Sequence, residues 1–292
     1  MKKYHKKWPW AEIIIIGLII AIVGFLIGFV AGNVKYADYI VETNAFFAPF
    51  EFYEKGEIVG VDVEIINRVA EKMGKTIEIK NVEFDVIIDN VEAGKIADAG
   101  AAGLTITPAR LEKVDFSMPY YTSMQYVMYA KNANLELRDG HATWEMLKGK
   151  TIGSQTGSTG YLFAQDEISE GVLAGTKTEL KGLDSHQIAA DGILAHVVDF
   201  VIADELAANF IVSKNPELAA APLYYEGATV AEDAPVEESY AIAVNKQRME
   251  LLAAFNEVLA EMTSRDPKGI SEIDRLVNKY SRYGVELEER EN

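Results

Sequence analysis

The sequence is 292 residues long; 49% of its residues are hydrophobic, 25% are charged, and none is a cysteine. This length allows one large or two ordinary domains with a real hydrophobic core, and the composition excludes a disordered chain. The absence of cysteine excludes disulfides, thiolate metal sites, a cysteine nucleophile and a lipidated-cysteine anchor. The net charge of −17 predicts a surface that repels phosphate backbones, so we expect no nucleic-acid partner.

Residues 1–35 combine a basic flank with a long apolar segment. Residues 13–32 contain no charged side chain, and four lysines lie between positions 2 and 7. A helix needs about 20 apolar residues to span a bilayer, and flanking lysines favour the cytoplasmic side. We therefore predict a cytoplasmic flank and a single-pass membrane anchor, with the rest of the chain on the extracytoplasmic side, periplasmic or extracellular. A cleaved signal peptide that releases a secreted protein is the alternative.

The chain after residue 35 alternates β-rich runs with helical ones, which predicts an α/β fold with largely parallel sheet. Gly74 and Gly94 follow two of the helical runs as stop signals. The acidic segment 226–238 is expected to be an irregular, solvated loop. In chain order the predicted elements are strand 39–41, helix 60–73, strand 76–80, helix 86–93, strands 97–100, 126–130 and 151–153, a helix after Ser158, strand 178–180, helix 188–196, strand 199–203, helix 205–212, strand 240–244, and helices 247–263 and 270–280.

The usual sequence motifs of enzymes and metal sites do not occur here. The four histidines lack the spacing that would place metal ligands on one helix face. No HExxH, P-loop, GxGxxG or GxSxG pattern is present. We therefore expect a non-enzymatic protein without a metal site or a cofactor.

Two runs rich in glycine and hydroxyl side chains each follow a predicted strand: AGLTITPAR at 102–110 and QTGST at 155–159. In an open α/β sheet, ligands bind beyond the carboxyl ends of the strands. Backbone N–H groups and hydroxyls in such loops can hold an anion, and Arg110 could hold a carboxylate with two parallel hydrogen bonds. Taken alone, either run could equally be a turn followed by a helix cap.

Six segments in a fixed order carry a family resemblance. They are NAFFAPFEFYEKGEIVGVDVEI, EFDVIIDNVEAGKIADAG, AAGLTITPARLEKVDFSMPYYTS, LKGKTIGSQTGSTG, VVDFVIADELAA and ESYAIAVNK. The set resembles the type II periplasmic polar amino-acid-binding proteins, the solute-binding components of ABC importers, over nearly all of residues 36–283. The resemblance implies a type II periplasmic-binding-protein-like fold, with two α/β lobes, two crossover strands and one ligand in the cleft. It places lobe 1 at 36–121 and 239–292, lobe 2 at 122–238, and hinges near 120–125 and 236–240.

The resemblance also implies how the ligand backbone would be held. Arg110 matches the family arginine that pairs with the α-carboxylate of the amino acid. The Gly103 backbone and the Thr105 hydroxyl are implied to support that carboxylate from lobe 1, and Thr159 from lobe 2. Ala102, at the start of the same run, is also included among the contacts. Each of these residues is therefore a predicted ligand contact.

Asp204 matches the family carboxylate that takes the α-ammonium group, so it and Arg110 would grip a zwitterion from opposite lobes. A structural ion pair between them is the alternative interpretation. Phe47 and Phe84 match an aromatic pair that sandwiches the ligand side chain through apolar contact or cation–π attraction. Either ring could instead be an ordinary core residue.

Selectivity depends on Asn44 and Gln155. Asn44 stands where relatives that bind basic amino acids often have Asp, and Gln155 occupies the lobe 2 position next to the ligand side chain. Amides offer donors and acceptors but no negative charge, and an unpaired buried cation is costly. We therefore predict a neutral polar ligand, glutamine first, with basic or acidic amino acids less favoured.

These residues predict an extracytoplasmic receptor, monomeric, that delivers a polar amino acid to the permease subunit of an ABC importer. One alternative is a ligand-binding sensor that acts through a separate signalling partner. Another is a dehydratase on the same fold. An enzyme would need a proton donor aimed at its substrate, and Asp204, the carboxylate nominated for the cleft, is already assigned to the ammonium group.

Overall fold

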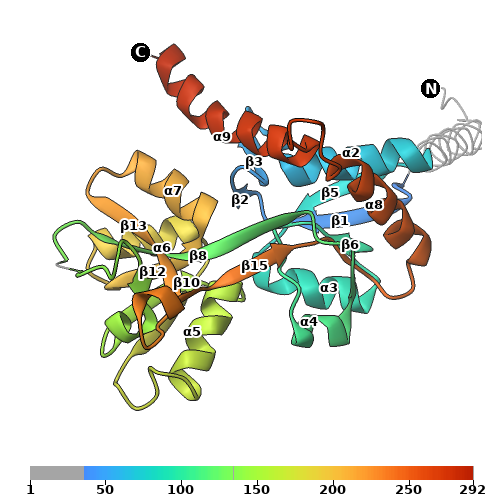
Figure 1. Ribbon diagram of the computed structural model, residues 1–292. Coiled ribbons are helices and arrows are strands. Elements are labelled where there is room, and N and C mark those ends of the chain that lie inside the picture. The colour runs from blue at the N-terminus through green and yellow to red at the C-terminus, as the bar shows by residue number, and fades with distance from the viewer. Residues whose placement is uncertain (1–35, 134, 292) are drawn as a thin grey trace, which may run out of the picture. The chain divides into compact units, whose positions relative to one another are not determined.

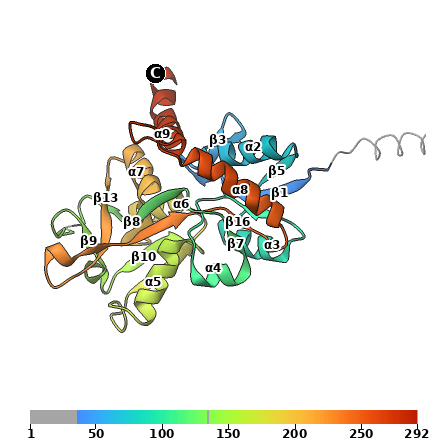
Figure 2. The same cartoon turned by 45° about the vertical axis from the view of Figure 1, so that its right-hand side comes forward.

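The computed structural model describes residues 36–133 and 135–291, and the chain from Asp38 onward forms one compact unit. This unit consists of two α/β lobes, each built on its own sheet (Figure 1 and Figure 2). Among the described residues, no helix has the length and apolar character that a membrane span requires. The span predicted over residues 13–32 lies outside the described part of the chain.

Lobe 1 contains a five-stranded sheet with helices on both faces. Its elements are β1 (Tyr39–Thr43), α2 (Val61–Met73), β5 (Ile77–Asn81), η1 (Phe84–Val86), α3 (Ile87–Ala93), β6 (Ala99–Gly100), α4 (Pro108–Lys113), β7 (Asp115–Phe116), β16 (Ala243–Val244), α8 (Met249–Met262) and α9 (Glu272–Glu291). The strand order is β5-β1-β6-β16-β7; β1 is parallel to β5 and β6, and β16 is antiparallel to β6 and β7. Helices α2 and α8 cover one face, and α3 and α4 the other (Figure 1).

Helix α2 follows directly from its sequence pattern. Val61, Ile65, Ile66 and Val69 recur at helical spacing and are all buried. Gly74 ends the helix in the left-handed conformation at φ 62°, which glycine adopts at little cost, so its predicted role as a stop is confirmed. The buried stripe joins the main core of lobe 1.

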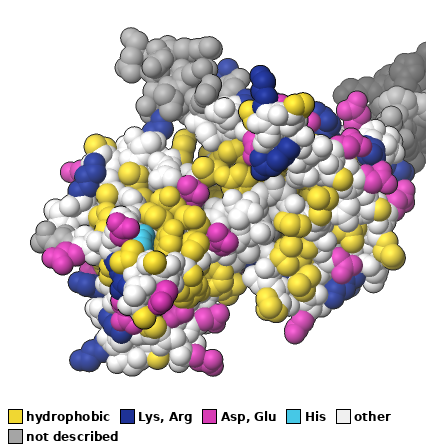
Figure 3. Space-filling view, viewed as in Figure 1, with side chains coloured by type: hydrophobic (Ala, Val, Ile, Leu, Met, Phe, Trp, Pro, Cys, Tyr) yellow, Lys and Arg dark blue, Asp and Glu magenta, His cyan; other side chains and the backbone are white. Residues whose placement is uncertain are grey.

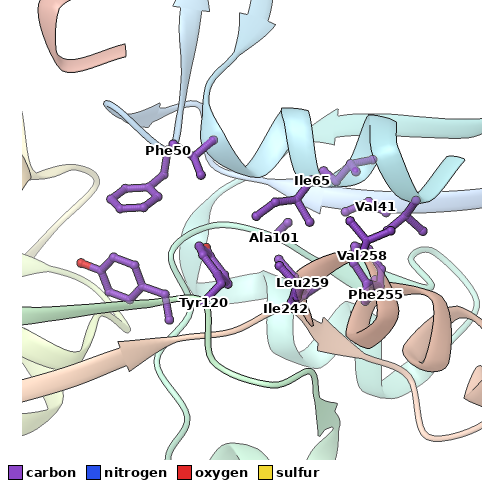
Figure 4. Close-up of a cluster of buried hydrophobic side chains, with 14 of the residues drawn as sticks. Val41, Phe50, Ile65, Ala101, Tyr120, Ile242, Phe255, Val258 and Leu259 are labelled. Carbon is purple, nitrogen blue, oxygen red and sulfur yellow. The ribbon is translucent and has the colours of Figure 1, made fainter. Parts of the chain in front are cut away.

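That core lies between helix α2, helix α8 and the sheet. Figure 4 shows Ile65, Val41, Val258 and Phe255 packed together, and all four are buried. Burying a side chain of this size contributes about 1.5–3 kcal/mol before conformational entropy is counted. The core fixes the β1 and β6 strand ends, which lead into the cleft.

Lobe 2 is built on the larger sheet. Its elements are β8 (Tyr121–Ala130), β9 (Ala142–Thr143), η2 (Trp144–Leu147), β10 (Thr151–Gln155), α5 (Thr159–Ser169), β11 (Glu179–Leu183), α6 (His186–Leu194), β12 (Phe200–Asp204), α7 (Glu205–Lys214), β13 (Leu218–Tyr225), η3 (Val230–Glu232), β14 (Ala234–Pro235) and β15 (Glu237–Tyr240). The order is β11-β10-β12-β8-β13-β14, with β15 paired to β8 and β9 to β13. Along β12, Phe200 and Ile202 face the core on the α5 side, whereas Val201 and Ala203 face α6 and α7.

Two strands, β8 and β15, connect the lobes and pair antiparallel with each other. β8 continues without a break into the lobe 2 sheet, where it runs antiparallel to both β12 and β13. A strand that enters a sheet directly needs no crossover helix, which parallel neighbours require. The predicted largely parallel arrangement is therefore wrong in this respect, because each lobe has a mixed sheet.

Several parts of the chain differ from the predicted elements. An antiparallel sheet of β2 (Phe46–Phe47), β3 (Glu51–Glu54) and β4 (Glu57–Val59) precedes α2, and neither it nor β13 was predicted. The segment 226–238, predicted to be a solvated loop, contains η3 and β14 and the start of β15. Pairing with the preceding strand β13 and with the distant strand β8 orders this acidic segment.

Candidate functional site

A small cavity lies between the lobes, where strands of both sheets end. It has a volume of about 10 Å³, close to the space that one water molecule needs. All ten predicted contact residues line it, together with two that were not predicted, Ser158 and His186. The lining residues are Asn44, Phe47, Phe84, Ala102, Gly103, Thr105, Arg110, Gln155, Ser158, Thr159, His186 and Asp204.

Arg110 crosses from lobe 1 toward lobe 2. The Thr107 hydroxyl caps helix α4 by accepting from the Arg110 backbone N–H at 3.2 Å. The guanidinium, in a side chain only 7% exposed, donates through Nη1 to the Thr105 carbonyl (2.7 Å) and through Nη2 to the Gly157 carbonyl (3.0 Å). Burial lowers its pKa to about 10, so it stays charged at neutral pH. Two of its five N–H groups are engaged, which leaves donors for a carboxylate.

Asp204 ends strand β12 on the opposite wall and is 7% exposed. Its Oδ1 accepts from Nε2 of Gln125 at 2.6 Å, since the two residues face each other in the register of β12 and β8. Burial, and then the charge of Glu238, raise the pKa of Asp204 well above its usual value. Neither carboxylate oxygen of Asp204 forms an ion pair with Arg110, so the structural ion pair considered from the sequence is absent between these two described residues.

Thr105 and Thr159 meet across the cleft, with their hydroxyl oxygens 3.5 Å apart. Both hydroxyls donate to Oε2 of Glu238, each at 2.5 Å. Glu238, on β15, is only 4% exposed, and its Oε1 accepts from Nε2 of Gln125 at 2.6 Å. Sequence reasoning missed Glu238 because it lies in the acidic segment predicted to be solvated. The threonine hydroxyl protons are thus directed at a protein carboxylate.

Asn44 and Gln155 form the other end of the cavity. Nδ2 of Asn44 donates to the Val82 carbonyl (2.8 Å), and Nε2 of Gln155 donates to Oδ1 of Asn44 (3.0 Å) and to the Asp184 carbonyl (3.2 Å). Because a backbone carbonyl can only accept, these bonds fix the orientation of both amides. Oε1 of Gln155 accepts no hydrogen bond from the described residues, so this end mainly offers acceptors.

Aromatic rings form the remaining walls. Gly103 adopts φ +54°, and a Cβ there would lie 2.6 Å from Cε1 of Phe47, so glycine lets the ring pack against bare backbone. The Phe47 ring lies 5.9 Å from the ring of His186. Phe84 lies 5.8 Å from Cζ of Arg110, within cation–π range. Burial lowers the pKa of His186 to about 4, so its ring is neutral at physiological pH.

A buried acidic group holds the Gly103 loop from behind. Asp62 accepts from the Gly103 backbone N–H (3.1 Å) and from the Tyr120 hydroxyl (2.6 Å). Burial raises the pKa of Asp62 to about 6. Burial, and then the charge of Asp62, raise the pKa of the neighbouring Glu51 carboxyl well above its usual range.

Sequence reasoning missed two residues of the cavity lining, Ser158 and His186, and the sequence signal that could have indicated each of them is different. Ser158 lies inside the quoted run 155–159 and caps helix α5 by accepting from the Tyr161 backbone N–H at 3.2 Å. His186 begins helix α6, one residue after its cap Ser185. A strand followed by a capped helix was a signal for another binding loop, because ligands gather at such strand ends.

Two lobes that close over a cavity with a buried guanidinium on one wall and a buried carboxylate on the other define a ligand-binding clamp. The family model for bacterial extracellular solute-binding proteins, family 3, matches residues 39–282. The chain belongs to this family.

Similar sequences and structures support the same family assignment. The arginine-binding extracellular protein ArtP of Bacillus subtilis is 30% identical over 244 residues, which cover 82% of this chain and 85% of ArtP. The structure of the amino acid ABC transporter substrate-binding protein AbpA from Streptococcus pneumoniae, bound to L-arginine, is similar with a TM-score of 0.70 and 29% identity, covering 85% of this chain and 95% of AbpA. An ancestral arginine-binding protein bound to glutamine has a TM-score of 0.64 and 30% identity, covering 85% of this chain and 98% of that chain.

Proposed function

We propose that this protein is an extracytoplasmic receptor that binds one polar α-amino acid between its lobes and delivers it to the permease subunit of an ABC importer. The observation that carries the proposal is the placement of Arg110 and Asp204 on opposite walls of one buried cavity. A guanidinium and a carboxylate so placed complement the two charged ends of an amino-acid zwitterion. Membership of the solute-binding family and the likeness to AbpA support the transport role.

The side-chain end of the cavity favours a ligand that donates hydrogen bonds. Asn44 and Gln155 present amide oxygens there, since Nδ2 of Asn44 donates to the Val82 carbonyl and Nε2 of Gln155 donates to the Asp184 carbonyl and to Oδ1 of Asn44. The Asp204 carboxyl group lines the cavity and is joined through Gln125 to that of Glu238, whereas Arg110 is the one Lys or Arg among the described lining residues. A cationic ligand side chain would improve this charge balance.

We therefore place arginine first and glutamine, whose terminal amide also donates, second. The arginine ligands of ArtP and AbpA support the first choice, and the glutamine-bound ancestral protein supports keeping the second. This ranking differs from the expectation from sequence, which put glutamine first because Asn44 and Gln155 carry no charge. That expectation stays a prediction. The side chain of an acidic ligand would add a further negative charge beside these carboxyl groups and is disfavoured.

The proposed mechanism is closure about hinges near 120–125 and 236–240, which separate a lobe of 36–121 and 239–292 from one of 122–238. The paired crossover strands β8 and β15 support this assignment. A cavity of about 10 Å³ is far too small for an amino acid to enter, so entry requires the lobes to separate. The ligand would dock on Arg110 first, and its ammonium group would then draw Asp204 across, so that only the bound state stays shut.

We also propose that residues 13–32 anchor the receptor to the membrane, which would keep it beside its importer. The support is the length of the uncharged run and the lysines before it. Mass spectrometry of the mature protein distinguishes the two possibilities, since an anchored receptor keeps its first residues. A mature chain that begins near Asn33 would mean secretion after signal cleavage.

Isothermal titration calorimetry with arginine, lysine, histidine, glutamine and glutamate tests the function. We expect saturable binding of at least one basic amino acid or glutamine, and none of glutamate. Small-angle scattering with and without the best ligand should report a smaller radius of gyration on binding. A protein that binds none of the five would refute the proposed receptor function. Co-purification of a sensor kinase in place of a permease would favour the sensor alternative.

A further inference from the structure

Glu238 sits at the junction of the two lobes and the hinge, yet it does not line the cavity. It accepts hydrogen bonds from Thr105 of lobe 1, Thr159 of lobe 2 and Gln125 of the other crossover strand. The same Gln125 nitrogen donates to Asp204 at 2.6 Å. A single buried carboxylate therefore contacts, directly or through one amide, three of the residues that face the ligand.

The chemistry of these bonds fixes what the threonines can offer. An ionised carboxylate only accepts, and a hydroxyl has one proton to donate and two lone pairs. The hydroxyl groups of Thr105 and Thr159 both donate their proton to Oε2 of Glu238. Each hydroxyl oxygen can therefore present only lone pairs to the cavity that both residues line. They are thus suited to accept from a ligand ammonium group and unsuited to donate to a ligand carboxylate.

The cavity offers as many hydrogen-bond acceptors for an α-ammonium group as that group has N–H donors. An α-ammonium group has three N–H donors. Thr105, Thr159 and the Asp204 carboxylate supply three acceptors in the same cavity, one from lobe 1 and two from lobe 2. The ammonium group would thereby join the lobes, while Arg110 takes the carboxylate.

We propose that Glu238 is a positioning residue that holds the hydroxyl protons of Thr105 and Thr159, so that both oxygens face the cavity as acceptors for the α-ammonium group of the ligand. This inference rests on the proposed function, since it assigns a polarity to the amino-acid site. It differs from the expectation that the Thr105 hydroxyl and Thr159 support the ligand carboxylate, which stays a prediction.

Glu238→Gln tests the inference because an amide cannot reproduce a carboxylate here. The glutamine side chain has one acceptor oxygen and one donor nitrogen. If its oxygen faces the threonines, its nitrogen meets the Gln125 nitrogen, and in the reverse orientation the threonine hydroxyls must turn round. Either arrangement disturbs the ammonium acceptors and leaves the hydrogen bonds of Arg110 in place. The matched control is Glu237→Gln, which removes the same charge from the exposed neighbour on the same strand.

The experiment compares an amino acid with the analogue that lacks its ammonium group, for example arginine with 5-guanidinopentanoate. Calorimetry on the wild-type chain, Glu237→Gln and Glu238→Gln gives the ratio of the two affinities for each protein, and thermal unfolding by circular dichroism verifies folding. We expect Glu238→Gln to lower the ratio at least tenfold, with the affinity for the analogue unchanged and the control equal to wild type. Equal weakening of both compounds would assign Glu238 a merely structural role and overturn the inference.

Failure of the proposed function and misfolding of the variant can each be distinguished from failure of this inference. A wild-type protein that binds neither compound nor the other amino acids contradicts the proposed function, whatever the variant does. If Glu238→Gln does not fold, Glu238→Asp keeps the charge but withdraws the carboxylate by one methylene. That variant should show the same selective loss for the amino acid, and an unchanged ratio in a folded Glu238→Asp would also overturn the inference.

Discussion

At one end of the cavity, Arg110 and Asp204 present buried ionisable groups, and Thr105 presents an oxygen whose proton is donated to Glu238. At the other end, Asn44 and Gln155 present neutral amides that hydrogen-bond to each other across the lobes at 3.0 Å. The first end holds groups that every amino acid carries, and its contacts are charge-assisted and expensive to disturb. The second end meets the part that differs between amino acids, through bonds that are individually weak.

This division implies that affinity and selectivity can be altered separately. Around the cleft, acidic side chains lie on both lobes and hydrophobic ones form patches beside the groove below the crossover strands (Figure 3). That groove, of about 770 Å³, shares Thr105 with the cavity and is also lined by Glu238. The charged end depends on buried partners, whereas the amide end depends on a few direct contacts.

Arg110→Ala should have the largest effect, because it removes the positive charge from the first end. We expect at least about a 100-fold loss of affinity for every amino acid that binds, in line with about 3–5 kcal/mol for breaking a buried charge pair. Calorimetry with arginine and with glutamine gives the two losses. Lys113→Ala, an exposed residue on the same helix, serves as control and should bind normally. Binding within threefold of wild type would contradict the assignment of this end.

Buried titratable groups behind the two walls should make stability respond to pH in opposite directions. The pKa of Asp62 is raised from 3.8 to about 6, so its contribution is present below pH 3.8 and is lost as pH rises through 6. The pKa of His186 is lowered from 6.5 to about 4, so its contribution is present above pH 6.5 and is lost as pH falls through 4. Each amounts to about 3 kcal/mol, and the two nearly cancel between pH 4 and 6.5.

Single substitutions reveal the two opposing contributions of Asp62 and His186 to the free energy of unfolding. Between pH 4.5 and 7, the free energy of unfolding of Asp62→Asn should rise more steeply with pH than that of the wild type. That of His186→Gln should rise less, or fall. Urea unfolding at the two pH values measures both slopes, and Asp139→Asn at an exposed loop position is the control. Parallel slopes for all four proteins would mean that neither group is shifted as described.

The sequence could predict the lobed α/β fold and much of the charged end. Helix α2 was found because its buried residues recur every three to four positions and Gly74 stops it. Arg110 was found because it lies in a glycine- and hydroxyl-rich run beside a strand end, whereas Asp204 was found through the family resemblance of its segment. These features depend on neighbours in the chain, so local patterns reveal them. The structure brings all ten predicted residues to one cavity, while their individual roles stay predictions.

The features that were missed depend on partners far away in the chain. Glu238 lies in an acidic run that predicts a solvated loop, and it is buried because β15 pairs with β8, more than 110 residues earlier. The mixed sheet of lobe 2 arises in the same way, since β8 crosses from one lobe into the other as a single strand. The bonds that turn Asn44 and Gln155 into acceptors involve the distant carbonyls of Val82 and Asp184. Charge patterns within a segment carry no information on such pairings.

Asn44→Asp should shift the amide end toward cations. A carboxylate at this position would attract a guanidinium or ammonium group, at the cost of the bond that Asn44 donates to the Val82 carbonyl. We expect the affinity for arginine relative to glutamine to rise about tenfold, or about 1.4 kcal/mol. Asn81→Asp is the matched control, since it adds the same charge nearby outside the cavity lining and can still accept from the Ala45 N–H. A ratio that does not change would remove Asn44 from the side-chain end.

Phe84→Leu should have the smallest effect on affinity. It tests whether the ring acts at the charged end of the cavity or at the end that meets the ligand side chain. Phe84 lies 5.8 Å from Cζ of Arg110, a contact worth about 0.5–1 kcal/mol. If the ring acts through Arg110, the variant should lose about two- to fivefold in affinity for arginine and glutamine alike, and Phe116→Leu, outside the cavity lining, should lose nothing. If the ring instead stacks on the ligand, as the sequence predicted, the loss should be larger for the guanidinium of arginine than for the amide of glutamine. Calorimetry with both amino acids separates these results, because a uniform loss assigns Phe84 to the charged end and an unequal loss assigns it to the selective one.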